Sequence, residues 1–472
     1  MTSRAANTLR TSVLSGIEGG RVMPAVYPFR AVQFQSGQGD VTYHVAPPYD
    51  VIDASRKAAL AEGSAGNVVS VDLPHTPAKE LGPPEAYAGA NDVLQKWLSD
   101  GTLTQRETPA IFAYRQTFEF LGERYERCGM TACVETQPFG PRDGGGILPH
   151  EQTFSGPKED RMALLKATAT QMSPIFGLHP DESGAASALV RKVMGSRDAD
   201  MTADLAETDG QAVRHEVWTI DDDATIAAYK DALAGEDVFI ADGHHRYTTA
   251  INYLKSMEES GGVPADHPAR RTMMVLIGMS DPGLAIGPTH RVLGGMSGYS
   301  ADAFVEAAGG YLEIKPVVND PQQIEAEIER EASTGGNVFG IYDFATGLCW
   351  VARPTDDDPL ADRFGDKPDA WRHLDVAIIQ HLIVEEICEP ELNDGEPVKW
   401  AFPHSIDEVV EIGKGHETGA GGGAGFAQIA IIVRPTPLEA VKDVSKANEL
   451  MPQKSTFFYP KLATGLFLNP LA

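Results

Sequence analysis

The chain has 472 residues, with 39 Lys and Arg residues against 67 Asp and Glu residues, so its formal net charge at neutral pH is -28. A surface this acidic repels phosphate backbones and anionic lipid headgroups, which excludes generic binding to nucleic acid or to a membrane surface. A hydrophobic content of 42% and a charged content of 22% are ordinary for a globular protein. A local pocket for a small anion stays open, because net charge does not describe individual sites.

The same sequence predicts a cytoplasmic protein. Its four cysteines are scattered and have neither the spacing of a zinc site nor that of a disulfide framework. No apolar run reaches the ~18–20 residues that a membrane helix needs. Residues 1–23 lack the apolar centre of a signal peptide, and we expect them to form a loose lead-in.

Short strands and helices are predicted to alternate along the chain, which indicates a mixed α/β fold. The segment 43–52 contains two consecutive prolines and is expected to be extended or turning. Residues 181–209, rich in Ala, Ser and Asp, are expected to form two surface helices. Apolar periodicity predicts helices over 85–99, 162–169, 223–233, 247–257, 301–309 and 377–387. Strands are predicted over 111–120, 125–134, 238–241, 273–279, 337–342 and 426–433.

The motif Asp242-Gly-His-His-Arg246 lies between a predicted strand and a predicted helix. A helix start presents unpaired N–H groups, and a glycine lets an anion approach the backbone. Arg246 can bind phosphate oxygens, and the two histidines can donate hydrogen bonds or carry protons. Asp242 would repel a phosphate, so we expect it to bind magnesium or to accept a hydroxyl proton. The alternative is that Asp242 only caps the helix.

Other candidate residues arrive from distant segments. His150-Glu151 follows the glycine-rich loop 141–149, where a general base or metal ligand could be positioned, although an exposed pair is usually plain surface. Arg161, the His290-Arg291 pair and Lys454 are cations of the kind that a phosphate clamp needs, although most such residues are merely solvated. The glycine-rich segment 413–425 matches neither a P-loop nor a dinucleotide fingerprint, so we predict a hairpin loop there.

Several motifs together resemble one known family, and the resemblance runs from about Pro28 to Leu466. On these motifs the chain is identified as a member of the bacterial family called domain of unknown function 1015. The motifs are Pro28-Phe-Arg30, Ala46-Pro-Pro-Tyr-Asp-Val-Ile52, His150-Glu-Gln-Thr153, Gly156-Pro-Lys-Glu-Asp-Arg161, Ala241-Asp-Gly-His-His-Arg-Tyr247, Pro288-Thr-His-Arg291, Met451-Pro-Gln-Lys-Ser-Thr456 and Tyr459-Pro-Lys461.

The motif 242–246, with the preceding segment 160–178, is also similar to the phosphate-binding motif of the ParB/sulfiredoxin-like fold, and within that fold to free-serine kinases. The resemblance implies a ParB/sulfiredoxin-like core over 141–300 with an insertion at 180–235. It implies additional α/β regions over 24–140 and 301–472. About ninety residues separate Glu151 from Asp242, a wide spacing for a compact core.

The resemblance implies a kinase of free serine that uses ATP or ADP, with magnesium. Glu151, Asp242 and His245 would be catalytic, and Asp242 would be the magnesium ligand. His150, Tyr49 and Asp50 would contact the substrate. The groups that would bind the phosphates or the nucleotide are Gly243, His244, Arg246, Arg161, His290, Arg291 and Lys454.

Two alternatives stay open at this point. The same site could run toward hydrolysis as a phosphoserine phosphatase, or the protein could bind nucleotide as a switch without catalysis. The charge of -28 argues against the DNA partner that some ParB-like switches have. The predicted partners are thus a small molecule and a nucleotide. The sequence leaves the oligomeric state open, a homodimer included.

Overall fold

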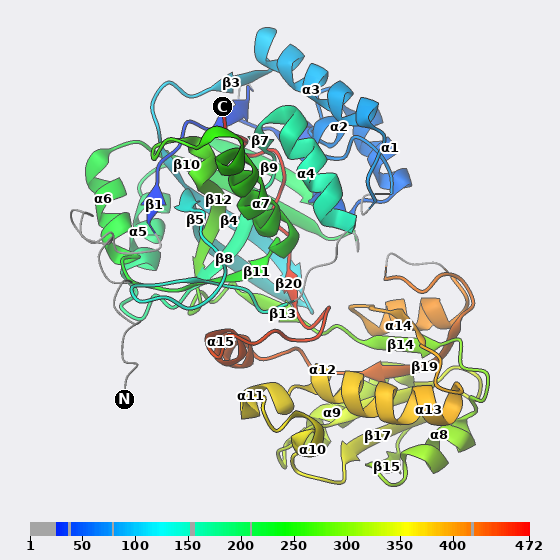
Figure 1. The fold of residues 1–472 in the computed structure, drawn as a ribbon. Helices are drawn as coiled ribbons and strands as arrows, with labels where there is room; N and C mark the ends of the chain where they lie inside the picture. The colour runs from blue at the N-terminus through cyan, green and yellow to red at the C-terminus, as the bar shows by residue number, and fades with distance from the viewer. Residues whose placement is uncertain (1–24, 36–38, 78–79, 152–155, 208–209, 417–419) are drawn as a thin grey trace, which may run out of the picture.

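The computed structural model describes residues 25–35, 39–77, 80–151, 156–207, 210–416 and 420–472. The predicted lead-in 1–23, and Gln152 and Thr153 of the His150 motif, lie outside these residues. Figure 1 shows two bodies, a larger one above and a smaller one below, each built on its own sheet. The prediction of a mixed α/β fold is confirmed.

The larger body contains a mixed sheet. Most neighbouring strands are antiparallel, but β6 and β11 run parallel, and so do β8 and β12. In spatial order its strands are β6 (Ile147–Leu148), β11 (Val238–Asp242), β8 (Ile175–His179), β12 (Arg271–Gly278), β5 (Glu123–Glu135), β4 (Ile111–Phe120), β10 (Ala212–Ile220) and β9 (Met201–Ala206), and β1 (Val26–Tyr27) pairs with β5.

Helices and short ladders surround this sheet. Its helices are α1 (Ala54–Gly63), α2 (Val69–Asp72), α3 (Pro84–Ser99), α4 (Gly156–Thr168), α5 (Ala185–Met194), α6 (Asp223–Ala232) and α7 (His244–Gly261), with 3-10 turns η1 (Thr42–His44), η2 (Tyr49–Val51) and η3 (Pro268–Arg270). The two-stranded ladders are β2 (Val32–Phe34) with β3 (Leu103–Gln105), β13 (Ala285–Gly287) with β20 (Phe457–Tyr459), and β7 (Thr170–Gln171) with β21 (Asn469–Pro470).

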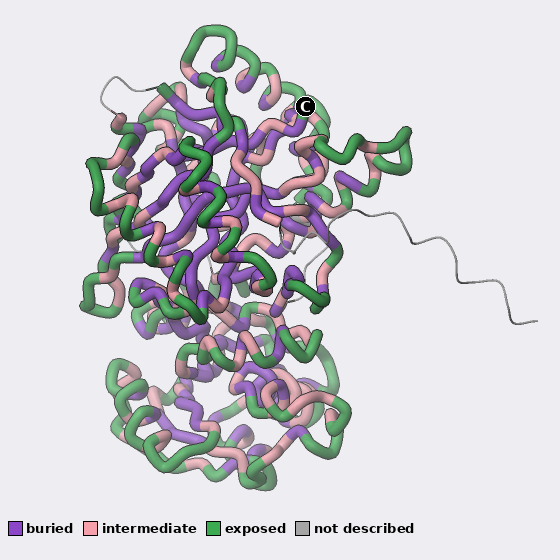
Figure 2. Tube along the Cα trace, turned by 90° about the vertical axis from the view of Figure 1, so that its left-hand side faces the viewer, coloured by how far each residue is buried: buried purple, intermediate pink, exposed green. Residues whose placement is uncertain are grey.

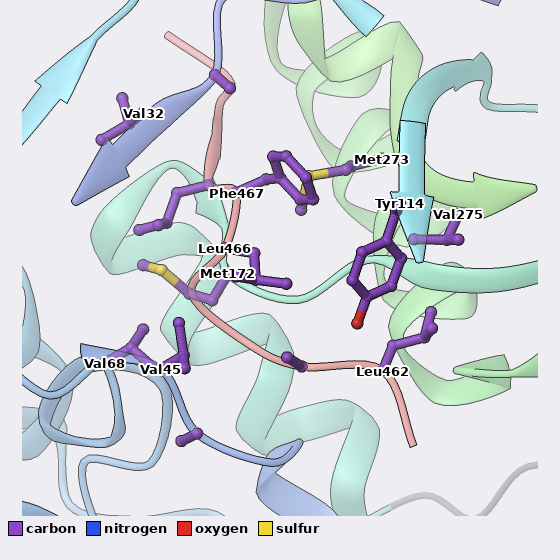
Figure 3. Close-up of a cluster of buried hydrophobic side chains, with 14 of the residues drawn as sticks. Val32, Val45, Val68, Tyr114, Met172, Met273, Val275, Leu462, Leu466 and Phe467 are labelled. Atoms are coloured by element: carbon purple, nitrogen blue, oxygen red, sulfur yellow. The ribbon is translucent and has the colours of Figure 1, made fainter. Parts of the chain in front are cut away.

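Two cores form because strand side chains alternate between the faces of the sheet. Met273 belongs to the core that α3 and α4 cover, whereas Met274 belongs to the core that α5 and α6 cover. The C-terminal segment crosses the first of these cores, where Phe467 packs near Tyr114 and Met273 (Figure 3). The last residues of the chain are therefore part of the interior of the larger body.

The smaller body has a six-stranded sheet in which every neighbouring pair is antiparallel. Its strands in spatial order are β15 (Leu312–Pro316), β17 (Cys349–Pro354), β16 (Phe339–Asp343), β19 (Ala427–Ile432), β14 (Arg291–Gly294) and β18 (Lys399–Ala401). Its helices are α8 (Ala301–Ala308), α9 (Ile324–Ala332), α10 (Ala361–Phe364), α11 (Asp369–Arg372), α12 (Asp375–Ile378), a π-helix η5 (Ile379–Cys388), α13 (Glu389–Leu392), α14 (Ile406–Gly413) and α15 (Leu438–Lys446), with a 3-10 turn η4 (Pro321–Gln323).

The chain passes between the bodies twice, first between β13 and β14 and again between α15 and β20. The return brings the segment 451–461 to the junction of the two bodies, where Met451 donates its N–H to the carbonyl of His150 at 2.8 Å. Figure 2 shows buried residues within both bodies and exposed residues along their outer helices and loops. The junction therefore brings together two distant stretches of sequence, the one that holds His150 and the segment 451–461.

Two predictions of local structure are wrong. Residues 181–209 contain one helix, α5, and then the edge strand β9, whose residues alternate between buried and less buried positions as in a half-buried strand. The glycine-rich segment joins α14 to β19 and is not a hairpin loop, because those neighbours are a helix and a strand. The four cysteines are free and buried, as expected. None of the helices in the described ranges is long and apolar enough to cross a membrane.

Candidate functional site at the start of helix α7

Strand β11 ends at Asp242 and helix α7 starts two residues later, with Gly243 between them in the left-handed region at φ 94°. A side chain at Gly243 would be strained there and would lie 3.1 Å from Ile175 Cδ1. The pairing of β11 with β8 shifts register between Ile240 and Asp242, and such irregularities re-aim side chains. The register shift therefore sets the direction of the Asp242 side chain. Because Gly243 has no side chain, the first backbone N–H groups of α7 are not covered at that position.

Both carboxylate oxygens of Asp242 are held by cations. Oδ1 accepts a hydrogen bond from the Lys461 ammonium at 2.6 Å, and Oδ2 accepts one from Arg246 Nη2 at 2.6 Å. Burial raises the pKa of Asp242, but Lys461 and Arg246 outweigh it and hold that pKa well below its usual range. Asp242 is therefore ionised, and it orients two cations at the start of α7.

A buried guanidinium holds the backbone next to Lys461. Arg127 is 1% exposed and donates to the carbonyl oxygens of Tyr459 and Pro460 at 2.9 and 2.5 Å. Gln116 donates from Nε2 to the carbonyl of Lys461 at 2.9 Å and accepts from Arg127. Burial lowers the pKa of Arg127 to about 10. Three consecutive carbonyls are thus fixed by strands β4 and β5, which limits where Lys461 can reach.

His150 and Glu151 reach the same place through strand pairing. β6 ends at Leu148 and runs parallel to β11, with Leu148 opposite Phe239. Because parallel neighbours end at the same edge of a sheet, the two motifs meet there despite their separation in sequence. The His150 N–H points at His244 Nε2, 3.3 Å away, and the two rings meet edge to face at 4.7 Å.

The hydrogen bonds of His150 define its tautomer. Nδ1 donates to the carbonyl of Ile240 at 2.8 Å, so Nε2 is left to accept from the Thr456 hydroxyl at 2.8 Å. Burial lowers the pKa of His150 to about 4. His150 is therefore a neutral ring that ties β11 to the C-terminal segment, and both of its ring nitrogens are used within the protein.

Glu151 is partly buried, with 19% of its side chain exposed. Oε1 accepts a hydrogen bond from the backbone N–H of Lys454, and the carbonyl of Lys454 accepts one from Arg291 Nη2 at 3.0 Å. Burial raises the pKa of Glu151 although the Lys454 ammonium lowers it. A carboxylate with a raised pKa is a stronger proton acceptor than an ordinary glutamate.

Arg291 is buried and its guanidinium lies 5.4 Å from the centre of the Phe402 ring. It also donates to the carbonyl of Thr289. Burial lowers the pKa of Arg291 to about 10, while the charge of Glu151 raises it. The smaller body thus contributes a cation near Glu151.

Two further histidines face these cations as neutral rings. His245 is partly buried, and burial lowers its pKa to about 4 although Asp50 opposes this. His404 stacks on Phe457 at 3.7 Å, and burial, with Lys461 and other cations, lowers its pKa to about 4. Both rings supply hydrogen-bonding groups but no positive charge near neutral pH.

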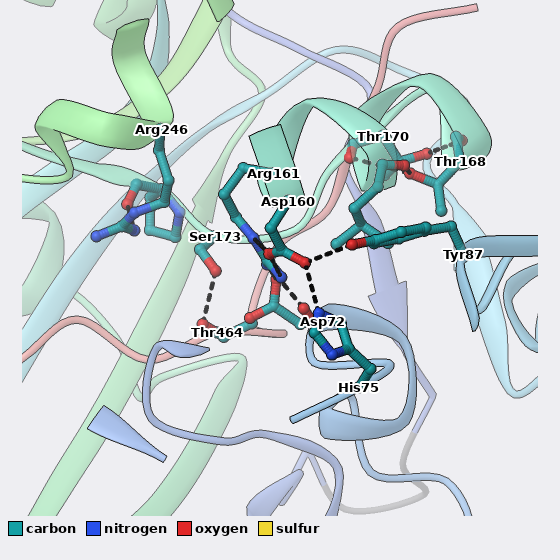
Figure 4. A network of polar contacts seen from close by, with 12 residues as sticks. Asp72, His75, Tyr87, Asp160, Arg161, Thr168, Thr170, Ser173, Arg246 and Thr464 are labelled. Atoms are coloured by element: carbon teal, nitrogen blue, oxygen red, sulfur yellow. Dashed lines mark hydrogen bonds and ion pairs between the residues drawn. The ribbon is translucent and has the colours of Figure 1, made fainter. Parts of the chain in front are cut away.

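Arg161 forms a separate buried network, shown in Figure 4. Its guanidinium contacts Asp160 at 2.6 Å and Asp72 at 3.1 Å, and it lies 4.0 Å from the ring of Tyr49. The Tyr87 hydroxyl donates to Asp160 at 2.8 Å. Two carboxylates already neutralise Arg161, so this cation is bound more tightly to the protein than Arg246 is.

A cavity of about 50 Å³ connects the two arginines. Arg161 and Arg246 both line it, together with Asp72, Ser173 and Thr249, and the remaining lining is largely apolar. The ring of Tyr49 lies against the Arg161 guanidinium, and Oδ1 of the adjacent Asp50 is buried without a hydrogen bond to any described residue. The structure therefore brings the Tyr49-Asp50 segment close to the predicted centre.

His290, a predicted site residue, lies away from the start of α7. It is fully buried, and its Nδ1 accepts a hydrogen bond from the backbone N–H of Val433 in the smaller body. Its Nε2 lies 3.8 Å from Glu325. Because its ring is enclosed by the smaller body, His290 does not face the start of α7, although its neighbour Arg291 does contact Lys454.

The carboxylate of Asp242 does not fit the predicted role of magnesium ligand. Each of its oxygens is 2.6 Å from a cation, so a divalent ion at this carboxylate would be repelled by Lys461 and Arg246. Magnesium also needs near-octahedral oxygen ligands, which these groups do not supply. The same pairing makes Asp242 a poor acceptor for a hydroxyl proton.

Sequence reasoning did not select Lys461, His404 or Arg127 as site residues. Lys461 lies in the Tyr459-Pro-Lys461 motif, so the family resemblance was a usable signal for it. His404 and Arg127 lie in segments without a motif, and only the folded chain brings them near Lys461.

A mixed α/β protein with two cations held beside a helix start is the class that this fold and site define. The family model described as protein of unknown function (DUF1015) matches residues 26–377, and the chain belongs to that family. A search among curated proteins returns no match.

Three solved structures show weak similarity. A free serine kinase in complex with AMP aligns with a TM-score of 0.30 and 12% identity, covering 68% of this chain and 88% of that chain. A conserved hypothetical protein from Pyrococcus furiosus gives a TM-score of 0.30 and 12% identity over 68% and 92% of the two chains. SbnI with C-terminal truncation from Staphylococcus aureus gives 0.30 and 10% over 69% and 84%. The assignment of the core to the ParB/sulfiredoxin-like fold stays a prediction.

Proposed function

We propose that this protein transfers a phosphoryl group from a nucleotide, ATP or ADP, to the hydroxyl of a small metabolite, with free serine as the first acceptor to test. The observation that carries the proposal is the pair of cations that Asp242 holds at the start of α7. Phosphoryl transfer needs mainly positioning and neutralisation of charge, which oriented cations and the backbone N–H groups of a helix start supply.

In this proposal the phosphates bind at Gly243 and the first turn of α7, next to Arg246 and Lys461. A phosphate can share both cations with Asp242, because Lys presents three donors and Arg five. The helix dipole and the backbone N–H groups favour the same anion. Asp242 then has the role of orienting the cations and takes no proton.

Glu151 is the proposed general base. Its carboxylate would take the proton of the acceptor hydroxyl as the hydroxyl oxygen forms its bond to phosphorus and the bond from phosphorus to the leaving nucleotide oxygen breaks. The raised pKa suits this role, and Arg291 is close enough for its charge to act on Glu151. His245, as a neutral ring, can donate a hydrogen bond to the transferred group.

The carboxylate of Asp50 favours an amino acid as the phosphoryl acceptor. Oδ1 of Asp50 is buried without a hydrogen bond to a described residue, and burying a carboxylate oxygen in that state is costly. The ammonium group of serine would satisfy it. Serine is tested first for this reason and because the motif 242–246 resembles that of free-serine kinases.

The test is incubation of the full chain with ATP or ADP, magnesium and a panel of hydroxyl metabolites, with mass spectrometry of the products. Phosphoserine formation supports the kinase. Release of phosphate from phosphoserine without nucleotide would favour the phosphatase. Nucleotide that raises the melting temperature while no substrate is consumed would favour a binding switch.

A further inference from the structure

A second group of chemically active side chains lies at the opposite end of β11 from Asp242. His179 ends β8, Glu236 precedes β11, and Asp181 follows β8. One ligand atom from each of these three residues lies within 4.8 Å of the others. About 13 Å of strand separates this group from the start of α7, at ~3.3 Å per residue.

The three side chains already face one another. His179 Nδ1 and Glu236 Oε2 are 2.8 Å apart, and the Asp181 N–H donates to the same oxygen at 3.1 Å. The Asp181 carboxylate accepts from the N–H groups of Ala186 and Ser187 at the start of α5. Backbone contacts therefore fix the carboxylate of Asp181 without using all of its lone pairs.

The two carboxylates lack an ordinary counter-ion. Asp181 is 3% exposed and the Glu236 side chain is 18% exposed. Within the described parts of the chain, neither forms an ion pair with a Lys or Arg residue. Buried carboxylates are normally paired with a cation or bind a metal, and His179 is a common metal ligand.

Tyr229 is a second, independent observation that points to a ligand beside Asp181 and Glu236. Its hydroxyl is fully buried in α6 and has no hydrogen-bond partner among the described residues. Burial raises the pKa of Tyr229 well above its usual range, and the charges of Asp181 and Glu236 add to the rise, so both carboxylates lie within electrostatic range of the hydroxyl. An orphaned buried hydroxyl calls for a partner, and a water on a bound ion would provide one.

We propose that His179, Asp181 and Glu236 bind a first-row divalent cation, with the Tyr229 hydroxyl bonded to a water on that ion. One imidazole and two carboxylates suit Zn²⁺ or Mn²⁺ better than Ca²⁺, which takes oxygen ligands. The ion would join the ends of β8 and β11 and so stiffen the strand that carries Asp242.

The test uses the full chain, free of any affinity tag and stripped of metal by a chelator, titrated with Zn²⁺ and with Mn²⁺ in a calorimeter. The expected result is one equivalent of either ion with a Kd of about 10 µM or tighter, and a melting temperature that rises on binding. The variant Glu236→Gln keeps the shape of the side chain and should weaken binding at least about tenfold. The matched control Glu182→Gln changes an exposed neighbour and should bind as the wild type does.

Binding weaker than about 10 µM for both ions, or a Kd that Glu236→Gln shifts by less than about tenfold, would overturn the proposal. If Glu236→Gln does not fold, His179→Asn takes its place, because its amide keeps a donor toward Glu236 and removes the ring nitrogen. Neither measurement depends on catalysis at the start of α7, so this site and the proposed function stand or fall separately.

Discussion

The Lys461 ammonium lies 2.6 Å from Oδ1 of Asp242, although 219 positions separate the two residues. Burial alone would lower the pKa of Lys461, but Asp242 raises it above its usual value, so the ammonium stays charged. The C-terminal segment thus supplies a permanent cation to the start of α7. A phosphate bound there would lie near two cations, Arg246 of α7 and Lys461 of the C-terminal segment.

Arg246→Ala should abolish turnover while leaving a folded protein. Asp242 keeps Lys461 as a partner, so we expect a loss of about 1–2 kcal/mol in stability and at least about a 100-fold loss in kcat/KM. Arg246→Lys keeps the charge but offers one nitrogen in place of the two that donate to Asp242 and to the carbonyl of Pro174, so its activity should be intermediate. Thermal melts and steady-state kinetics check both. Wild-type kcat/KM in Arg246→Ala would contradict the assignment.

Glu151→Gln should remove the general base and little else, because an amide oxygen can still accept from the Lys454 N–H. We expect kcat to fall at least about 100-fold with a small change in KM. In the wild type the base must be ionised, so kcat/KM should fall as the pH drops through the raised pKa of Glu151, above the ordinary value of 4.5. A pH–rate profile whose acid limb survives in the variant would assign that limb to another group.

Arg127 is expected to act as a positioning residue for Lys461. In Arg127→Met the carbonyls of Tyr459 and Pro460 lose their donor, the ion pair with Asp242 loosens, and the Lys461 amine becomes more nucleophilic. Acylation of Lys461, followed by mass spectrometry, should quicken about tenfold. Lys315, 58% exposed and in the smaller body, is the internal control and should label as before. Unchanged labelling of Lys461 in a folded variant would show that Arg127 does not hold it.

Acid should destabilise the protein through its buried neutral histidines. Burial lowers the pKa of His215 to about 3, against an ordinary value of 6.5, so only the unfolded chain takes up this proton between those values. Stability should therefore fall as the pH drops from 6.5 toward 3, by about 1.4 kcal/mol per pH unit for each such group. His215→Gln should reduce that slope by one proton in denaturant titrations at several pH values.

Tyr114→Phe is the matched control, because it removes the hydrogen bond at 2.6 Å to His215 but keeps the titrating ring. Its stability should be lower at every pH with an unchanged slope. If His215→Gln and Tyr114→Phe gave the same slope, the proton uptake would belong to other groups.

The sequence predicted local elements well where apolar period was strong, as in α3 and β4. It failed at β9, because an edge strand rich in Ala and Asp gains its stability from pairing with β10, which composition does not report. The contact of His150 with His244 could not be predicted from sequence spacing either, since it depends on the parallel pairing of β6 with β11.

The ion pairs of Asp242 likewise could not be predicted from the sequence. The motif 242–246 predicted a strand, a glycine turn and a helix start, and Gly243 does lie in the left-handed region at the start of α7, whereas phosphate binding there stays a prediction. That Asp242 holds two cations, rather than a magnesium ion, depends on Lys461 arriving from the C-terminal segment. His290 appeared equivalent to Arg291 in sequence, yet the strand pairing of β14 encloses its ring.

We propose that the site at the start of α7 transfers phosphoryl groups from a nucleotide to a hydroxyl metabolite. The most direct measurement is phosphorus NMR of the full chain with magnesium, serine and either ATP or ADP, run beside Arg246→Ala. We expect a phosphoserine signal that grows in step with loss of the donor nucleotide and is absent with the variant. Unchanged nucleotide and no phosphorylated metabolite with the folded wild-type protein would contradict it.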